Sequence, residues 1–221
     1  MINLGKTFIL GDSYSTFAGY IPDKYAAYYS TCGSGGTDVD NVEQTWWHQL
    51  LSETQATLVK NCSYSGTTIC NTGYDGSDCS KISFIARIDQ LIETDYFNDK
   101  KVDTFFIFGG TNDSWANAPI GEIMYSNWDK EDLYSVLPAF CYLLDRVSKN
   151  LPDTNVYCII NTDLKSDITE GFTKVCEKYK TDVIRLKDID KINRHPSIKG
   201  MTQIKNQIFE FICQERRVHK Q

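Results

Sequence analysis

Short apolar runs alternate with longer segments of helical period along the whole chain. Mainly apolar runs predict buried strands at 6–10, 56–62, 102–110, 155–161 and 182–186. Apolar residues that recur every three or four positions predict amphipathic helices at 42–53, 81–94, 130–150, 166–179 and 197–214. Strands that alternate with helices of this length imply crossover connections, and therefore a parallel sheet covered on both faces. The pattern predicts a three-layer α/β/α sandwich with a central parallel sheet of about five strands.

Two long segments interrupt this alternation, at 16–41 and 111–131. Loops of this length inside a compact domain are usually functional or disordered, and their many aromatic residues disfavour disorder. The chain has 221 residues, of which 41% are apolar. This length suits one domain, spanning 1–221, better than two.

Charge and hydropathy exclude several classes of protein. A net charge of −6 and a pI near 5.1 argue against a nucleic-acid partner. No window approaches the roughly 18 apolar residues that a membrane span requires, and no basic, apolar leader precedes the first strand. We therefore expect a cytoplasmic protein with no membrane partner, or an exported one if a leader peptide has been removed. A monomer is the default expectation.

The eight cysteines are scattered and include no Cys-x-x-Cys pair. Several lie inside apolar runs, where a thiol usually packs as a small hydrophobic group. One disulfide among Cys62, Cys70 and Cys79 is possible in an exported protein. Without paired ligand spacing or nearby histidines we expect no metal site, and nothing in the sequence indicates a cofactor.

Polar residues follow four of the predicted strands. The segments are "GDSYS" after the first strand, "NCSYSGTT" after the second, "GGTND" after the third and "KDIDKINRHPS" after the fifth. Ligands of an open parallel sheet bind outside the carboxyl ends of its strands. We therefore expect these four segments to meet at one edge and to form a site.

The residues in these segments suit nucleophilic catalysis on an acyl group. Ser13 needs an adjacent base, usually a neutral imidazole held by a third group. The chain has three histidines. His48 lies in a predicted helix and His219 lies near the C-terminus, so His195 is the candidate base. The negative oxygen of a tetrahedral intermediate needs hydrogen-bond donors. The backbone N–H groups of Ser13 and Gly66 and the side-chain amide of Asn112 are the candidates.

These four segments resemble the conserved blocks of the SGNH hydrolases, also called GDSL-type esterases and lipases. The match extends from residue 7 to about 201, with Ser13 as nucleophile, Gly66 and Asn112 as oxyanion donors, and His195 of "HPSIKGM" as base. The resemblance implies a flavodoxin-like fold and metal-free ester hydrolysis through an acyl-enzyme. It also implies that the turn after the first strand exposes Ser13 to substrate, near His195.

The third member of the expected triad departs from the family pattern. The family usually places an aspartate three residues before the histidine, and here that position is Ile192, which cannot accept a hydrogen bond. Asp190 is the first candidate to orient His195, provided that the intervening residues fold back as a turn. A backbone carbonyl or Asn193 would instead leave a Ser–His dyad, and Asp188 or a distant carboxylate is a further alternative.

The substrate is less well defined by the sequence. Aromatic residues fall in or beside the loops over the expected site: Tyr14, Phe17, Tyr20, Tyr28, Tyr29, Tyr64, Trp115, Tyr125 and Trp128. Aromatic faces suit stacking on sugar rings, so removal of small O-acyl groups, acetyl above all, from a carbohydrate is the leading hypothesis. The alternatives are a small-acyl esterase or thioesterase acting on a soluble metabolite, and a binding module with little catalysis on the same fold.

Overall fold

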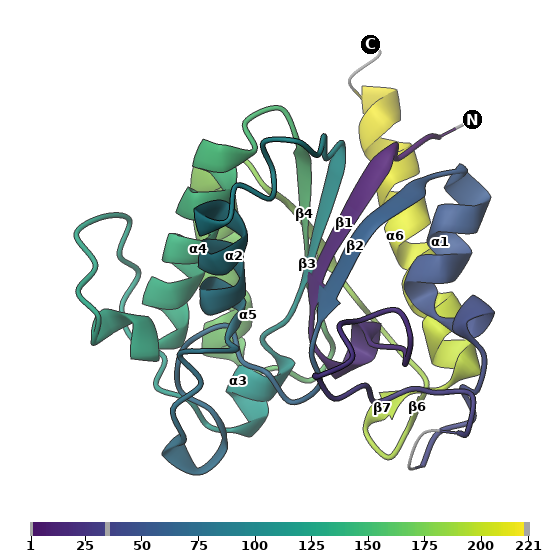
Figure 1. Ribbon diagram of the computed structural model, residues 1–221, viewed down its shortest axis with the longest axis horizontal. Helices are drawn as coiled ribbons and strands as arrows, with labels where there is room; N and C mark the ends of the chain where they lie inside the picture. The colour runs from purple at the N-terminus through teal and green to yellow at the C-terminus, as the bar shows by residue number, and fades with distance from the viewer. Residues whose placement is uncertain (1, 34–35, 219–221) are drawn as a thin grey trace.

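The computed structural model describes residues 2–33 and 36–218. Its sheet is parallel, with the strand order β2-β1-β3-β4-β5. The strands are β1 (Lys6–Gly11), β2 (Thr57–Ser63), β3 (Thr104–Phe108), β4 (Asn155–Ile160) and β5 (Asp182–Arg185). One face is covered by α2 (Phe84–Glu93), α4 (Val136–Asn150) and α5 (Ser166–Tyr179), and the other by α1 (Trp46–Thr54) and α6 (Ile198–Val218) (Figure 1). The predicted three-layer α/β/α sandwich with five parallel strands is confirmed.

The strands are apolar on both faces because helices cover both sides of the sheet. In β1, Phe8 and Leu10 belong to the core on the side of α2, α4 and α5, whereas Ile9 belongs to the core on the side of α1 and α6. In β3, Phe105 contributes to the first core and Phe106 to the second. This alternation produces the continuous apolar runs seen in the sequence.

The strand order reverses between β1 and β3. From β1 the chain moves outward to β2 and then returns to the other side of β1 as β3. The connections from β1 and β3 therefore leave in opposite directions, and in open parallel sheets the carboxyl ends of the strands at such a reversal are where ligands bind. Three short elements lie at this edge: α3 (Thr111–Trp115), β6 (Lys191–Ile192) and β7 (His195–Pro196) (Figure 1).

Some boundaries differ from the prediction because single residues interrupt the helical backbone. The segment predicted as one helix at 130–150 begins with a separate 3₁₀ turn, Asp132–Tyr134, because Ser135 has an extended conformation. The helix predicted at 81–94 begins at Phe84, where the Ser83 hydroxyl accepts a hydrogen bond from the Ala86 N–H.

All eight cysteines have free thiols, Cys62, Cys70 and Cys79 among them. Within the described residues, no helix combines the length and the apolar character that crossing a membrane requires.

Candidate active site

Ser13 lies in a 3₁₀ turn, Ser13–Ser15, that directly follows β1. The Asp12 carboxylate caps this turn by accepting a hydrogen bond from the Tyr14 N–H at 3.1 Å. A Cβ at Gly11 would lie 2.6 Å from the Ser63 hydroxyl and 2.9 Å from the Ser15 side chain, so glycine leaves room for these two side chains beside the turn. Ser13 is at the carboxyl end of β1 as predicted, but it is only 3% exposed rather than open to solvent.

His195 begins the second strand of a hairpin and reaches back to Ser13. The turn between β6 and β7 consists of Asn193 and Arg194, whose φ values of 48° and 68° are typical of a type I′ turn. The His195 Nε2 atom lies 3.0 Å from the Ser13 Oγ atom. The structure thus brings together two side chains 182 residues apart in sequence.

The other ring nitrogen of His195 contacts a backbone carbonyl. His195 Nδ1 lies 3.2 Å from the Asn193 carbonyl oxygen. A carbonyl only accepts hydrogen bonds, so Nδ1 carries the proton and Nε2 is left to accept one from the Ser13 hydroxyl. This is the tautomer that a general base needs.

Asp190 does not orient His195, in contrast to our first expectation. Its carboxylate accepts a hydrogen bond from the Ser197 hydroxyl and lies 3.7 Å from the Lys199 ammonium group. The tight hairpin turn is the physical reason, because it places the Asn193 carbonyl at Nδ1. Asp188 is exposed, and among the described residues no carboxylate hydrogen-bonds to the His195 ring. The geometry is that of the alternative expectation, a Ser13–His195 dyad in which a backbone carbonyl holds the ring.

The environment of His195 favours the neutral imidazole. Burial lowers the pKa of His195 below its ordinary value, and the positive charge of Lys191 lowers it further. The hydrogen bond to the Asn193 carbonyl acts in the opposite direction and raises the pKa of His195. The net shift is downward, which keeps the base unprotonated in mildly acidic solution.

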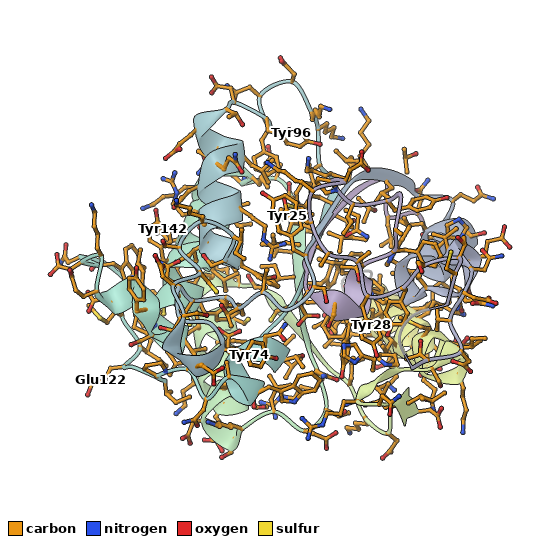
Figure 2. The ribbon with its side chains drawn as sticks, turned by 60° about the horizontal axis from the view of Figure 1, so that its bottom comes forward. Tyr25, Tyr28, Tyr74, Tyr96, Glu122 and Tyr142 are labelled. Carbon is orange, nitrogen blue, oxygen red and sulfur yellow. The ribbon has the colours of Figure 1, made fainter. Side chains whose placement is uncertain are left out.

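Three aromatic rings surround the imidazole. The Tyr28 ring stacks on it, with centroids 3.5 Å apart and an interplanar angle of 8°. The Tyr14 and Trp115 rings lie 5.4 Å and 5.9 Å from it. In Figure 2, Tyr28 lies beside the purple turn that follows β1. These three of the predicted aromatic residues therefore line the site.

Other aromatic residues from the predicted group pack elsewhere. Tyr20 lies against Trp47, with centroids 5.6 Å apart. Tyr125 packs on Tyr179 and Trp128 on Tyr142. These three rings therefore pack on residues other than His195.

The Asn112 side chain is held in one orientation at the start of α3. Its Oδ1 atom accepts a hydrogen bond from the Tyr74 hydroxyl at 2.7 Å, and its Nδ2 atom donates one to the Thr67 carbonyl at 2.9 Å. The Nδ2 group has a second N–H for an oxyanion.

The loop after β2 presents a further donor. Gly66 is exposed, and its φ of 77° lies in the region that favours glycine. Neither its N–H nor that of Ser13 donates to another group of the described residues. The Tyr64 N–H donates to the Gly11 carbonyl at 3.2 Å and so ties this loop to the end of β1. Hydrogen bonds thus connect the segments that carry Ser13, Gly66 and Asn112.

Asp113 fixes the loop after β2 to α3, a role that sequence reasoning missed. Its carboxylate accepts hydrogen bonds from the Ile69 N–H at 3.0 Å and the Cys70 N–H at 3.2 Å. Burial raises the pKa of Asp113 to about 6, while these two hydrogen bonds lower it. The one acidic residue of "GGTND", next to Asn112, was the available signal.

Arg87 is the second missed residue, and it is fully buried. Its guanidinium donates to the Gly11 carbonyl at 3.1 Å, to the Cys62 carbonyl and to the Thr67 hydroxyl at 3.1 Å. These bonds join the ends of β1 and β2 to the loop that carries Gly66. An arginine on the otherwise apolar stripe of the predicted helix at 81–94 was the sequence signal.

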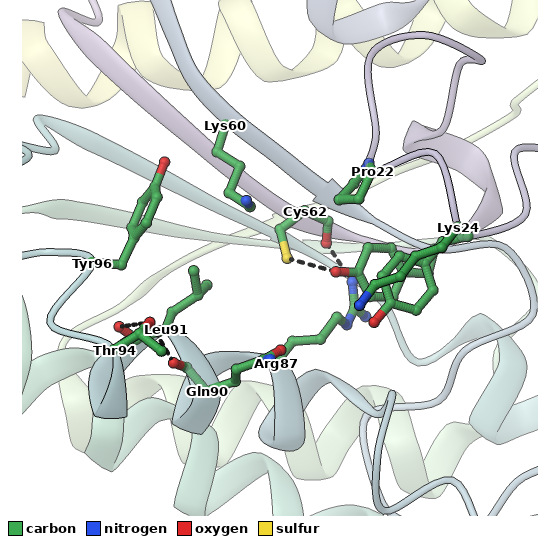
Figure 3. Close-up of a pocket in the computed structure, with 11 residues that line it drawn as sticks. Pro22, Lys24, Lys60, Cys62, Arg87, Gln90, Leu91, Thr94 and Tyr96 are labelled. Atoms are coloured by element: carbon green, nitrogen blue, oxygen red, sulfur yellow. Dashed lines mark hydrogen bonds between the residues drawn. The ribbon is translucent and has the colours of Figure 1, made fainter.

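A cavity of about 280 Å³ lies beside Arg87, between α2 and the β2 edge of the sheet. Lys60 reaches into it from β2 and Lys24 from the 16–41 segment (Figure 3). The Arg87 guanidinium lies between the rings of Tyr64 and Phe84, 4.4 Å and 4.3 Å from their centroids. The cavity therefore adjoins the residue that holds the Gly66 loop rather than the Ser13–His195 pair.

Asp12 is buried next to this network. Burial raises the pKa of Asp12 to about 7, an effect reinforced by Asp113 and opposed by the hydrogen bond from Tyr14 and the charge of Arg87. One carboxylate oxygen of Asp12 has no hydrogen-bond partner among the described residues. Asp12 is therefore a buried acidic group under the nucleophile turn, and the net effect of its surroundings is to raise its pKa.

His48 does not contribute to this pair. His48 lies in α1, where its ring packs on Trp47 with centroids 5.8 Å apart. His219 lies outside the described residues. In the described ranges, no group of three or more His, Cys, Asp or Glu residues is arranged to hold a metal ion.

Comparison with known families agrees with this geometry. The profile of the GDSL-like Lipase/Acylhydrolase family matches residues 5–212, nearly the whole chain. The chain belongs to this family. It is a GDSL-type esterase with the SGNH hydrolase fold, and members of this class act on ester substrates.

Solved structures include similar members of the GDSL-like family. A GDSL-like lipase from Bacteroides ovatus ATCC 8483 is 46% identical, with a TM-score of 0.90 and coverage of 96% of this chain and 99% of that one. A GDSL-like lipase from Bacteroides uniformis ATCC 8492 is 43% identical, with a TM-score of 0.87 and coverage of 95% and 96%.

A more distant likeness shows the fold alone. It is to a family two carbohydrate esterase from Clostridium thermocellum, solved in complex with cellohexaose. That protein is 16% identical, with a TM-score of 0.63 and coverage of 97% of this chain and 65% of that one. A comparison with curated proteins found no match.

Proposed function

We propose that this GDSL-type esterase removes small O-acyl groups, acetyl above all, from a carbohydrate, through an acyl-enzyme on Ser13. The observation that carries the proposal is the 3.0 Å contact between Ser13 Oγ and His195 Nε2. A serine hydroxyl becomes a useful nucleophile only when such a base takes its proton. A binding module has no need of this contact, so the geometry favours catalysis.

In the first step, Ser13 Oγ attacks the acyl carbon while His195 Nε2 takes the hydroxyl proton. The acyl oxygen becomes negative and accepts hydrogen bonds from the N–H groups of Ser13 and Gly66 and from the second Asn112 Nδ2 hydrogen. The alcohol then leaves with the proton from Nε2. Water attacks the acylated Ser13 in the second step, and His195 again takes and returns the proton.

The Asn193 carbonyl stabilises the imidazolium less than a carboxylate does. It carries a partial rather than a full negative charge, although it still fixes the Nδ1–H tautomer. In the dyad the His195 ring is therefore oriented, but its imidazolium form is stabilised less than in a triad.

The choice of a carbohydrate substrate is supported by the aromatic wall of the site. Tyr28 and Trp115 flank the base, and aromatic faces pack well against sugar rings. The cellohexaose complex of the Clostridium thermocellum esterase shows that a protein of this fold binds a saccharide.

The experiment that tests the proposal is a substrate panel. Acetylated mono- and oligosaccharides are compared with p-nitrophenyl esters of increasing acyl length and with acyl thioesters, using wild type and Ser13→Ala. We expect the highest kcat/KM on acetylated saccharides, with all turnover dependent on Ser13. Higher kcat/KM on long-chain esters or on thioesters would reject the carbohydrate assignment and leave the serine mechanism intact.

Asp190→Asn is expected to change kcat by less than about threefold. Asparagine can still contact Ser197, and the His195 ring depends on the Asn193 carbonyl rather than on Asp190. Loss of an orienting aspartate in a serine protease triad costs about 10⁴-fold, so the two possibilities are well separated. Steady-state kinetics with p-nitrophenyl acetate makes the measurement, and a loss of a hundredfold or more would restore Asp190 to the mechanism.

The pH dependence of kcat/KM is expected to report a depressed histidine pKa. The active form has neutral His195, so activity persists below pH 6.5 and falls as the pH falls through the lowered pKa. Lys191→Gln removes a positive charge beside the ring and should move the midpoint of the acid limb to higher pH. A wild-type midpoint above about pH 7, or an unshifted one in Lys191→Gln, would contradict this assignment.

A further inference from the structure

We propose that Tyr28 is a positioning residue that holds the His195 imidazole by ring stacking, in the place of the orienting aspartate that this chain lacks. The inference rests on the proposed function, because it concerns the same base. It is carried by the close parallel stack of the two rings, with centroids 3.5 Å apart and planes within 8°.

The Asn193 carbonyl alone leaves the ring underdetermined. One hydrogen bond at Nδ1 permits the ring plane to tilt about that bond, whereas Nε2 must stay aimed at Ser13 Oγ. A flat aromatic surface against one whole face of the imidazole removes this freedom. Together, the hydrogen bond and the stack define the ring plane and its direction.

The backbone of Tyr28 is tied to the nucleophile turn. Its N–H donates to the Thr16 hydroxyl at 2.8 Å, and that hydroxyl donates to the Ser13 carbonyl at 2.9 Å. Two hydrogen bonds therefore connect the residue whose ring stacks on the base to the residue that supplies the nucleophile.

The neighbouring residue is tied to the hairpin of the base. The Tyr29 hydroxyl donates to the Pro196 carbonyl at 3.1 Å, and its ring contacts that of Tyr28 at 5.0 Å. The Tyr28–Tyr29 pair thus joins the two segments that supply nucleophile and base.

A stacked phenol ring also supports the charged state of the base. The face of an aromatic ring attracts a cation, so the imidazolium that forms in each transition state is stabilised by Tyr28. The ring requires no hydroxyl for this role, and the described residues give the Tyr28 hydroxyl no hydrogen bond to His195. Phenylalanine at position 28 should therefore preserve this role, whereas alanine should not.

The test compares Tyr28→Phe, Tyr28→Ala and a matched control, Tyr20→Ala, from the same loop. Tyr20 packs on Trp47 rather than on the base. With p-nitrophenyl acetate, which has no sugar ring to pack on Tyr28, we expect Tyr28→Ala to lower kcat at least about tenfold with KM within about threefold, and the other two variants to remain near wild type. Equal losses in the Phe and Ala variants, or no loss in Tyr28→Ala, would overturn the inference.

A spectroscopic readout separates positioning from general loop damage and from failure of the proposed function. The ¹⁵N chemical shifts of the His195 ring are measured in the Ser13→Ala background, where no turnover is required. With Tyr28 or Phe at this position we expect one narrow set of ring ¹⁵N signals with the proton on Nδ1, and with alanine we expect broadened signals and faster exchange of the Nδ1 proton with solvent. Equal line widths and equal proton exchange in all variants would refute the role of Tyr28 even if the enzyme proves to be an esterase.

Discussion

Ser13→Ala is expected to lower kcat on p-nitrophenyl acetate by at least about 10⁴-fold. Without Oγ there is no atom to accept the acyl group, and His195 at 3.0 Å has no hydroxyl to deprotonate. Because Ser13 is buried and its side chain is small, the fold should be retained. Steady-state kinetics checks the rate, and circular dichroism checks the fold.

The control for this prediction is non-additivity. When two residues act as one catalytic unit, replacing one of them costs the enzyme nearly as much activity as replacing both. Ser13→Ala combined with His195→Ala should therefore be no slower than Ser13→Ala alone. A Ser13→Ala enzyme with a tenth of the wild-type rate would show that another residue is the nucleophile.

Arg87→Met is expected to lower the free energy of unfolding by about 3 kcal/mol. Methionine fills much of the volume but leaves the buried Cys62 carbonyl and Thr67 hydroxyl without their donor. It also removes the positive charge that lowers the pKa of the buried Asp12 carboxyl. Urea unfolding measures the change, and kcat should fall as well because the Gly66 loop loses an anchor.

Arg146→Met is the matched control for this effect. Arg146 lies on α4 and pairs with Asp89 at 2.9 Å, with both side chains partly exposed. Such a pair contributes about 1 kcal/mol or less. Equal urea midpoints for the two variants would show that the buried network around Arg87 does not hold the strand ends together.

The fold was predictable because its strands are buried on both faces. Runs such as Phe8 to Leu10 are apolar at every position, and the helices between them dictate parallel pairing. The short elements at the site were not predictable in this way. The turn after β1, the helix α3 and the β6–β7 hairpin contain too few residues to show a period.

The site was predictable where a role depends on residue type. Ser13 and Asn112 could be predicted because they come shortly after β1 and β3 in the chain. His195 could be predicted because the chain has few histidines. The support of the base depends instead on a backbone carbonyl and a ring stack. Neither the Asn193 carbonyl nor the contact with Tyr28, 167 residues away from His195, leaves a motif in the sequence.

The most direct test of the Ser13–His195 dyad is covalent labelling with a p-nitrophenyl alkylphosphonate, which phosphonylates activated serines, followed by peptide mass spectrometry. We predict one stable adduct on Ser13 that forms in step with loss of esterase activity, forms at the wild-type rate in Asp190→Asn, and is absent in His195→Ala. An inactivated enzyme with its adduct on another residue, or equal labelling of Ser13 in His195→Ala, would contradict the dyad.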